Sequence, residues 1–206
     1  MSQDEFIQNL LDEKKIDYTS FRQLSHEVRK MLLDYQKDHV LQLANVIRKK
    51  FIALDGSDTG TGKTYAAIAV AKELGLRPLI VCPKVMIPIW KAVCKLFGVK
   101  WFDVVNYETL RNGKTYDPKG TGKRVKTTYL KVKEITKDIT PEEAYKWKLP
   151  ENILVIFDEV HKCRESGTYN SFLLTSLRTV VLGKQARVLL LSATVSEDAT
   201  QMKNIF

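Results

Sequence analysis

Short, nearly continuous apolar runs alternate with helical stretches over most of this chain. A strand that is apolar along its whole length is buried on both faces, as in a parallel sheet with helices on both sides. The chain is therefore predicted to be an α/β domain with a mostly parallel central sheet. The expected strands are 51–54, 78–83, 102–107, 153–157 and 187–194, and the expected helices are 36–49, 64–74, 87–97 and 168–181.

The size and composition of the chain fit one globular domain. It has 206 residues, of which 44% are hydrophobic and 28% are charged. Residues 1–33 carry apolar residues at helical spacing and are expected to form an N-terminal helical segment with a break near Asp17–Ser20. The main domain is expected to span residues 34–206.

Several classes of protein are excluded by what the sequence lacks. It has no run of about 18 apolar residues, so no membrane-spanning helix is expected, and its polar, acidic N-terminus is not a signal peptide. Three scattered cysteines, Cys82, Cys94 and Cys163, are too few for a disulfide framework or a zinc site. We expect an intracellular protein, cytoplasmic or nuclear, without a membrane partner.

The stretch SDTGTGKT, residues 57–64, lies between an expected strand and an expected helix. Glycines there allow backbone N–H groups to face an anion, and the positive end of the helix points at the same place. We interpret it as a P-loop that binds ATP, in which Lys63 reaches the β- and γ-phosphates and Thr64 offers its hydroxyl to Mg²⁺. Ser57 stands where the first Gly of the motif is usual. The expected nucleotide-binding residues are Ser57, Thr59, Gly60, Thr61, Gly62, Lys63 and Thr64.

A second Gly-Thr-Gly-Lys, residues 120–123, lacks this setting. Arg124 occupies the position of the metal-binding hydroxyl, and no buried strand precedes the glycines. Asp117, Pro118 and the two glycines are typical of a turn, so this copy is predicted to be the tip of a hairpin.

The hairpin lies in a strongly basic insertion at about 111–137. This segment has nine basic and two acidic residues, a net charge of +7 out of the +9 of the whole chain. Two interpretations stay open: a solvated hairpin, or an arm that contacts the phosphates of a nucleic acid.

The apolar run 153–157 leads directly into Asp158 and Glu159. The carboxyl ends of parallel strands meet at one edge of the sheet, where ligands bind. Asp158 is therefore expected to hold Mg²⁺, mostly through water, and Glu159 to orient or deprotonate the attacking water; Lys63, Asp158 and Glu159 form the expected catalytic set.

SDTGTGKT, DEVH at 158–161 and SAT at 192–194, in this order, resemble the first RecA-like lobe of superfamily 2 helicases and translocases of the DExH type. NYETL at 106–110 is similar to Swi/Snf-type remodellers and their viral and phage relatives. The resemblance covers roughly residues 32–206 and implies a RecA-like P-loop domain that hydrolyses ATP in contact with nucleic acid, which we expect to be DNA rather than RNA.

The resemblance also implies roles for particular residues. Gln36, in the pair Tyr35–Gln36, would read adenine. The coupling of the ATP state to nucleic acid would involve His161, Ser192, Ala193 and Thr194, and the contacts with nucleic acid would involve Pro83, Lys84, Asn106 and Tyr107.

The family works with two lobes, and the second lobe is expected to be absent from these 206 residues. The chain alone is therefore expected to be nearly inactive. Two alternatives remain: a P-loop NTPase of another class, such as a kinase, and a nucleic-acid-binding module whose nucleotide only sets its conformation.

Overall fold

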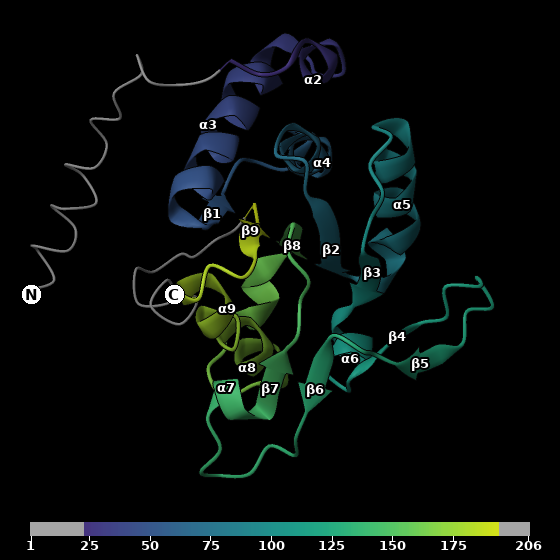
Figure 1. Cartoon of the computed structure of the whole chain (residues 1–206), viewed down its shortest axis with the longest axis vertical. Helices are drawn as coiled ribbons and strands as arrows, with labels where there is room; N and C mark the ends of the chain where they lie inside the picture. Colours follow the sequence, from purple (N-terminus) through teal and green to yellow (C-terminus); the bar gives the residue numbers. More distant parts are fainter. Residues whose placement is uncertain (1–22, 194–206) are drawn as a thin grey trace, which may run out of the picture.

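The computed structural model describes residues 23–193, and its centre is a sheet of five parallel strands (Figure 1). The strand order is β1-β9-β8-β2-β3, and every neighbouring pair is parallel. The predicted parallel α/β sheet is thus confirmed. The strands are β1 (Ile52–Asp55), β2 (Arg77–Cys82), β3 (Asp103–Asn106), β8 (Ile153–Asp158) and β9 (Arg187–Leu191).

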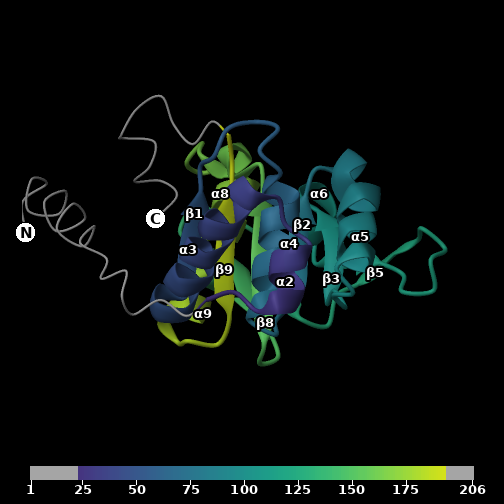
Figure 2. The same ribbon diagram turned by 90° about the horizontal axis from the view of Figure 1, so that it is seen from above.

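Helices cover both faces of this sheet (Figures 1 and 2). One face packs against α2 (His26–Lys30), α3 (Asp34–Lys50), α4 (Lys63–Glu73) and α5 (Ile87–Leu96), with the 3-10 turn η2 (Lys84–Met86) ahead of α5. The other face packs against α6 (Tyr107–Leu110), α7 (Pro141–Ala144), α8 (Tyr169–Thr175) and α9 (Arg178–Leu182), and the 3-10 turn η3 (Val160–Cys163) follows β8.

The central strand β8 shows why the apolar runs are continuous. All six of its residues are buried. Ile153, Val155 and Phe157 belong to the core on one face, whereas Leu154 and Ile156 belong to the core on the other. A strand with helices on both sides has no solvent face, so both sets of alternating positions must be apolar.

The insertion between β3 and β8 forms two antiparallel ribbons. The first pairs β4 (Lys114–Tyr116) with β5 (Arg124–Lys126), and the second pairs β6 (Leu130–Val132) with β7 (Tyr145–Trp147). Gly120 and Gly122, with φ of 76° and 73°, lie in the turn between β4 and β5. The second Gly-Thr-Gly-Lys is therefore a hairpin turn, as predicted, but the second ribbon was not foreseen.

The expected helix 168–181 is in fact two helices, α8 and α9. Ser176 lies at the break, is fully buried, and donates from Oγ to the carbonyl of Leu173 at 2.7 Å. The same Oγ accepts a 2.8 Å hydrogen bond from Trp147 Nε1. A serine that bonds back to its own helix weakens the helical ladder, which explains the break.

The N-terminal segment is described only from residue 23 onward, so the expected break near Asp17–Ser20 lies outside the described residues. In the described part, Leu24, Val28 and Leu32 join the core of the main domain rather than form a separate unit. All three cysteines are buried and unbridged. Among residues 23–193, no helix combines the length and the apolar character needed to cross a bilayer.

Candidate ATP-binding and hydrolysis site

The P-loop connects β1 to α4 at the carboxyl edge of the sheet. Gly60 and Gly62 have φ of 82° and 87°, a region that glycine enters without strain, so both predicted glycine positions require glycine. Gly62 is the N-cap of α4 and makes no side-chain capping hydrogen bond. The first N–H groups of a helix have no partner within it. An uncapped helix start beside a glycine loop therefore fits a phosphate group.

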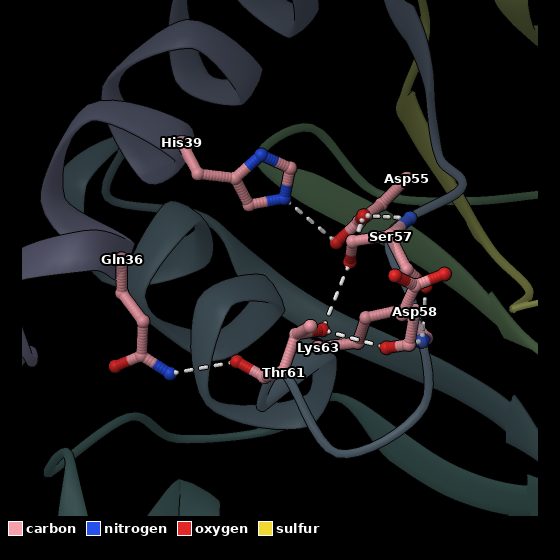
Figure 3. Close-up of polar contacts among 7 residues, drawn as sticks. All are labelled: Gln36, His39, Asp55, Ser57, Asp58, Thr61 and Lys63. Atoms are coloured by element: carbon pink, nitrogen blue, oxygen red, sulfur yellow. Dashed lines mark hydrogen bonds and ion pairs between the residues drawn. The ribbon is translucent and has the colours of Figure 1, made fainter.

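Lys63 lies in the first turn of α4, and its ammonium group is held by the loop itself. Nζ donates to the carbonyl oxygens of Ser57 at 2.6 Å and Asp58 at 2.8 Å. Figure 3 shows the lysine side chain running along the loop beside these residues. The cation is thus positioned at the P-loop, and a phosphate oxygen would replace loop carbonyls as its partner.

Asp55, at the end of β1, organises the start of the loop. Its Oδ1 accepts hydrogen bonds from Ser57 N at 3.0 Å and from Ser57 Oγ at 2.7 Å. Ser57 Oγ also lies 3.1 Å from Thr61 Oγ1, which donates to the carbonyl of Asp58 at 2.8 Å. Ser57, the departure from the usual glycine, therefore cross-links the loop through its hydroxyl.

His39 on α3 pairs with Asp55, with 3.1 Å between Nε2 and Oδ2 (Figure 3). The hydrogen bond to Asp55 raises the pKa of His39, against the opposing effects of burial and of Lys63. Burial alone would raise the pKa of Asp55, but hydrogen bonds from His39 and Ser57 outweigh it and lower this pKa. No role was predicted for His39, because nothing in its own helix reveals a partner on β1.

Gln36 projects from α3 onto the P-loop (Figure 3). Its Nε2 donates to the carbonyl of Thr61 at 3.2 Å, and its Oε1 accepts from the backbone N–H of Leu33 at 3.1 Å. Both ends of the amide are thus engaged within the protein. Each end of the amide keeps one further hydrogen-bonding position, so the adenine contact expected for Gln36 stays a prediction. Gln36 lines a pocket of about 250 Å³ together with Tyr35, His39, Ser57, Thr61, Lys63 and Ala66.

Asp158 ends β8 and is held from two sides. Its Oδ2 accepts a 2.9 Å hydrogen bond from the indole Nε1 of Trp90, and its backbone carbonyl accepts a 2.7 Å hydrogen bond from the hydroxyl of Tyr107. Burial raises the pKa of Asp158, while the Trp90 hydrogen bond acts in the opposite direction and Lys63 opposes it electrostatically.

Glu159 follows with φ of 58°, a left-handed conformation that is rare for a residue with a side chain. Such strain is common at functional sites. Its Oε2 lies 3.2 Å from Nδ1 of His161, and the same Nδ1 lies 3.1 Å from Oγ of Ser192. The structure thus joins DEVH to Ser192. Ala193 adjoins this contact in the chain, whereas Thr194 lies outside the described residues.

The four residues expected to contact nucleic acid differ in exposure. Lys84 is exposed and Pro83 half-buried after β2, whereas Asn106 and Tyr107 are only 2% and 1% exposed. Asn106 Oδ1 accepts from the Tyr116 hydroxyl at 2.8 Å. Asn106 and Tyr107 therefore act inside the protein, and we revise their role from surface contact to support of the strand end and of Asp158.

The site has few protein ligands for a metal. Among residues 23–193, no group of three or more His, Cys, Asp or Glu side chains is placed to hold an ion. Mg²⁺ commonly uses one or two protein oxygens and completes its shell with phosphates and water. Thr64 in the first turn of α4 and the carboxylate of Asp158 fit this mode.

Residues 29–197 match the family described as "Type III restriction enzyme, res subunit". A protein of Acanthamoeba polyphaga mimivirus, provisionally named an ATP-dependent RNA helicase, is 44% identical over 200 residues, which are 96% of this chain and 37% of that protein. The solved SWI2/SNF2 ATPase core of Sulfolobus solfataricus in complex with double-stranded DNA has the same fold, with a TM-score of 0.51 and 16% identity over 84% of this chain and 34% of that one.

The chain spans little more than a third of each of these relatives. The match to the family covers most of its length, and the observed sheet, P-loop and DEVH segment are those expected of it. The chain belongs to the Type III restriction enzyme res subunit family, and it is a RecA-like lobe of the superfamily 2 type.

Proposed function

We propose that this lobe binds Mg·ATP and, together with a second RecA-like lobe, couples ATP hydrolysis to movement along a nucleic acid. The observation that carries the proposal is the contact of His161 with both Glu159 and Ser192, at 3.2 and 3.1 Å. His161 thereby connects the carboxylate of Glu159, the proposed catalytic base, to Ser192 in the segment after β9.

The P-loop residues account for nucleotide binding in this proposal. Backbone N–H groups at Gly60–Lys63 surround the phosphates, and Lys63 donates to their β- and γ-oxygens. Thr64 and Asp158 hold Mg²⁺, which supplies charge neutralisation when bound. Trp90 supports this role because its N–H orients one carboxylate oxygen of Asp158 and leaves the other for a metal or its water ligands.

Glu159 is the proposed base. Its carboxylate accepts a proton from the attacking water, and His161 orients it. A change in the position of Ser192 would move His161 and therefore Glu159, so nucleic acid bound near the third motif could alter turnover. These contacts would couple nucleic-acid binding to ATP hydrolysis. They therefore favour the hydrolysing lobe over the alternative of a binding module without ATP turnover.

DNA is the proposed nucleic acid, in line with the double-stranded DNA in the structural relative. RNA is the second candidate, because the mimivirus relative is named an RNA helicase. Measuring ATP hydrolysis by this lobe together with a second RecA-like lobe, with no nucleic acid, with duplex DNA or with RNA, distinguishes them. We expect stimulation by DNA. Stimulation by RNA alone would show that the nucleic acid is RNA and not DNA. No stimulation by either would refute the proposed coupling of ATP hydrolysis to nucleic acid.

Glu159→Gln tests the catalytic step in the same assay. The amide cannot accept the proton of water, so this variant should bind Mg·ATP like the native protein and lose most of its turnover. Glu165→Gln, at an exposed position shortly after the DEVH segment, is a control for the removal of one negative charge and should keep full activity. Turnover of the Glu159→Gln variant within a few-fold of native would show that another group acts as the base.

A further inference from the structure

The β4–β5 ribbon is an ordered element that projects beyond β3, the edge strand of the sheet (Figures 1 and 2). Its base is fixed by the Thr115 hydroxyl, which donates to Asp103, and by the Tyr116 hydroxyl, which donates to Asn106 at 2.8 Å. Its tip is fixed by Asp117, whose carboxylate accepts from the N–H of Lys119 at 3.0 Å and the hydroxyl of Thr121 at 2.8 Å. The base and the turn of this ribbon therefore have defined positions.

Both ribbons of the insertion place two lysines directly opposite each other. Lys114 is the register partner of Lys126 in the first ribbon, and Lys131 is the partner of Lys146 in the second. Like charges in directly opposed cross-strand positions destabilise a ribbon, because their Cβ atoms lie only about 4.5–5.5 Å apart. A folding requirement alone would favour a neutral or acidic residue at one position of each pair.

The cations of these ribbons also form no ion pairs within the described part of the chain. Lys114, Lys123, Arg124, Lys126, Lys131 and Lys146 are all exposed, and none of them makes an ion pair with another described residue. By contrast, Lys37 on α3 and Lys72 on α4 pair with Asp34 and Glu27. The insertion thus concentrates exposed positive charge on a rigid support.

We propose that the two ribbons form a docking surface for the sugar-phosphate backbone of duplex DNA, outside the ATP site. The choice of DNA rests on the proposed function. The complementary charge of a phosphate backbone relieves the repulsion within each lysine pair, and lysines placed on paired strands can contact successive phosphates without reading base sequence. The surface would keep the lobe bound to the DNA while ATP is hydrolysed and its products are released.

Salt dependence of DNA binding tests this surface directly. Each phosphate that the protein no longer neutralises should reduce the slope of log K against log salt by roughly 0.9, so replacing Lys114, Arg124 and Lys126 with Gln should flatten it by up to about 2.7. The control replaces three other exposed lysines with Gln: Lys30 at the end of α2, Lys95 in α5 and Lys100 in the loop after α5. Fluorescence anisotropy with duplex DNA and with duplex RNA, on the full-length protein, gives the slopes.

We expect a flatter slope on duplex DNA in the ribbon variant and a native slope in the control. An unchanged slope in the ribbon variant, or an equal flattening in the control, would show that the ribbons are only solvated. An effect confined to RNA would overturn the assignment to DNA. Because the ribbon variant removes both lysines of the opposed Lys114–Lys126 pair, and with them their mutual repulsion, it should melt no lower than native, which separates weaker DNA binding from a folding defect.

The same variants separate this inference from the proposed function. Binding of Mg·ATP, measured by calorimetry without nucleic acid, should be native in both variants because neither set of residues lies at the P-loop. If the native protein bound no ATP but the ribbon variant still flattened the DNA slope, the proposed function would fail and the docking surface would stand. The reverse result would remove the docking surface alone.

Discussion

The hydrogen bond between Trp90 and Asp158 connects the stability of the fold to the proposed Mg²⁺ ligand, and its contribution can be tested with a matched pair of variants. Trp90 is fully buried, and its Nε1 donates to a buried carboxylate at 2.9 Å. Trp147 is also buried, and its Nε1 donates to the neutral hydroxyl of Ser176 at 2.8 Å. Replacing either with Phe removes an indole N–H and a similar volume, so the two differ mainly in the charge of the acceptor.

The expected difference follows from the acceptors. A hydrogen bond to a charged group contributes about 1.5–3 kcal/mol, against about 0.5–1.5 kcal/mol for a neutral one. Trp90→Phe should therefore cost about 1 kcal/mol more than Trp147→Phe in the free energy of unfolding. For a chain of this size that is a further fall in Tm of about 2–4 °C. Urea unfolding and thermal melts followed by circular dichroism measure both quantities.

The difference in stability between the two variants should also depend on pH, in a direction set by the pKa of Asp158. The Trp90 hydrogen bond acts to lower the pKa of Asp158, whose net pKa is raised by burial. The bond therefore stabilises the folded state above the pKa of Asp158, and this contribution disappears as pH falls through it. The gap between the two variants should be widest at alkaline pH and close on acidification. A gap that is absent, reversed or independent of pH would refute the role assigned to Trp90.

Three further predictions concern the P-loop and the lobe as a whole. Lys63→Ala should weaken Mg·ATP binding at least about ten-fold, since it removes charge-assisted bonds worth about 1.5–3 kcal/mol each; unchanged affinity by calorimetry would place the nucleotide elsewhere. The pKa of His39 is raised by its pairing with Asp55, so the pairing stabilises the folded state fully below the ordinary His pKa of 6.5. This stabilisation is lost as pH rises through the raised pKa of His39. It is also lost in acid, as pH falls through the lowered pKa of Asp55. Tm measured across neutral to alkaline pH should therefore fall less in His39→Gln than in the native protein, and equal slopes would contradict the pairing. The 206-residue chain alone should hydrolyse ATP very slowly, because related enzymes lose about 10³ to 10⁵ in rate without the arginine that a partner element supplies; rapid DNA-stimulated turnover by this chain would disprove the need for a second lobe.

The sequence alone determined the parts of this protein that are local in the chain. Continuous apolar runs predicted the parallel sheet, because a strand covered on both faces has no polar side. The P-loop is a strand, a glycine loop and a helix start in one contiguous stretch, and Asp158 follows directly from β8, so their positions at one sheet edge could be inferred. The turn at Gly120 and Gly122 was predicted for the same reason, since turn chemistry is carried by neighbouring residues.

Only the tertiary structure decided which distant residues meet. Trp90 and Asp158 are 68 positions apart, and His161 and Ser192 are 31 apart. These contacts depend on the order β1-β9-β8-β2-β3 and on the helices above it, and neither is encoded in the periodicity of any one segment. Tyr107 shows the consequence: its motif suggested a surface role, but the fold buries it under β8, where its hydroxyl holds the backbone of Asp158. A local motif predicts the chemistry that a side chain can perform, whereas its contact partners are set by the packing of elements that lie far apart in the chain.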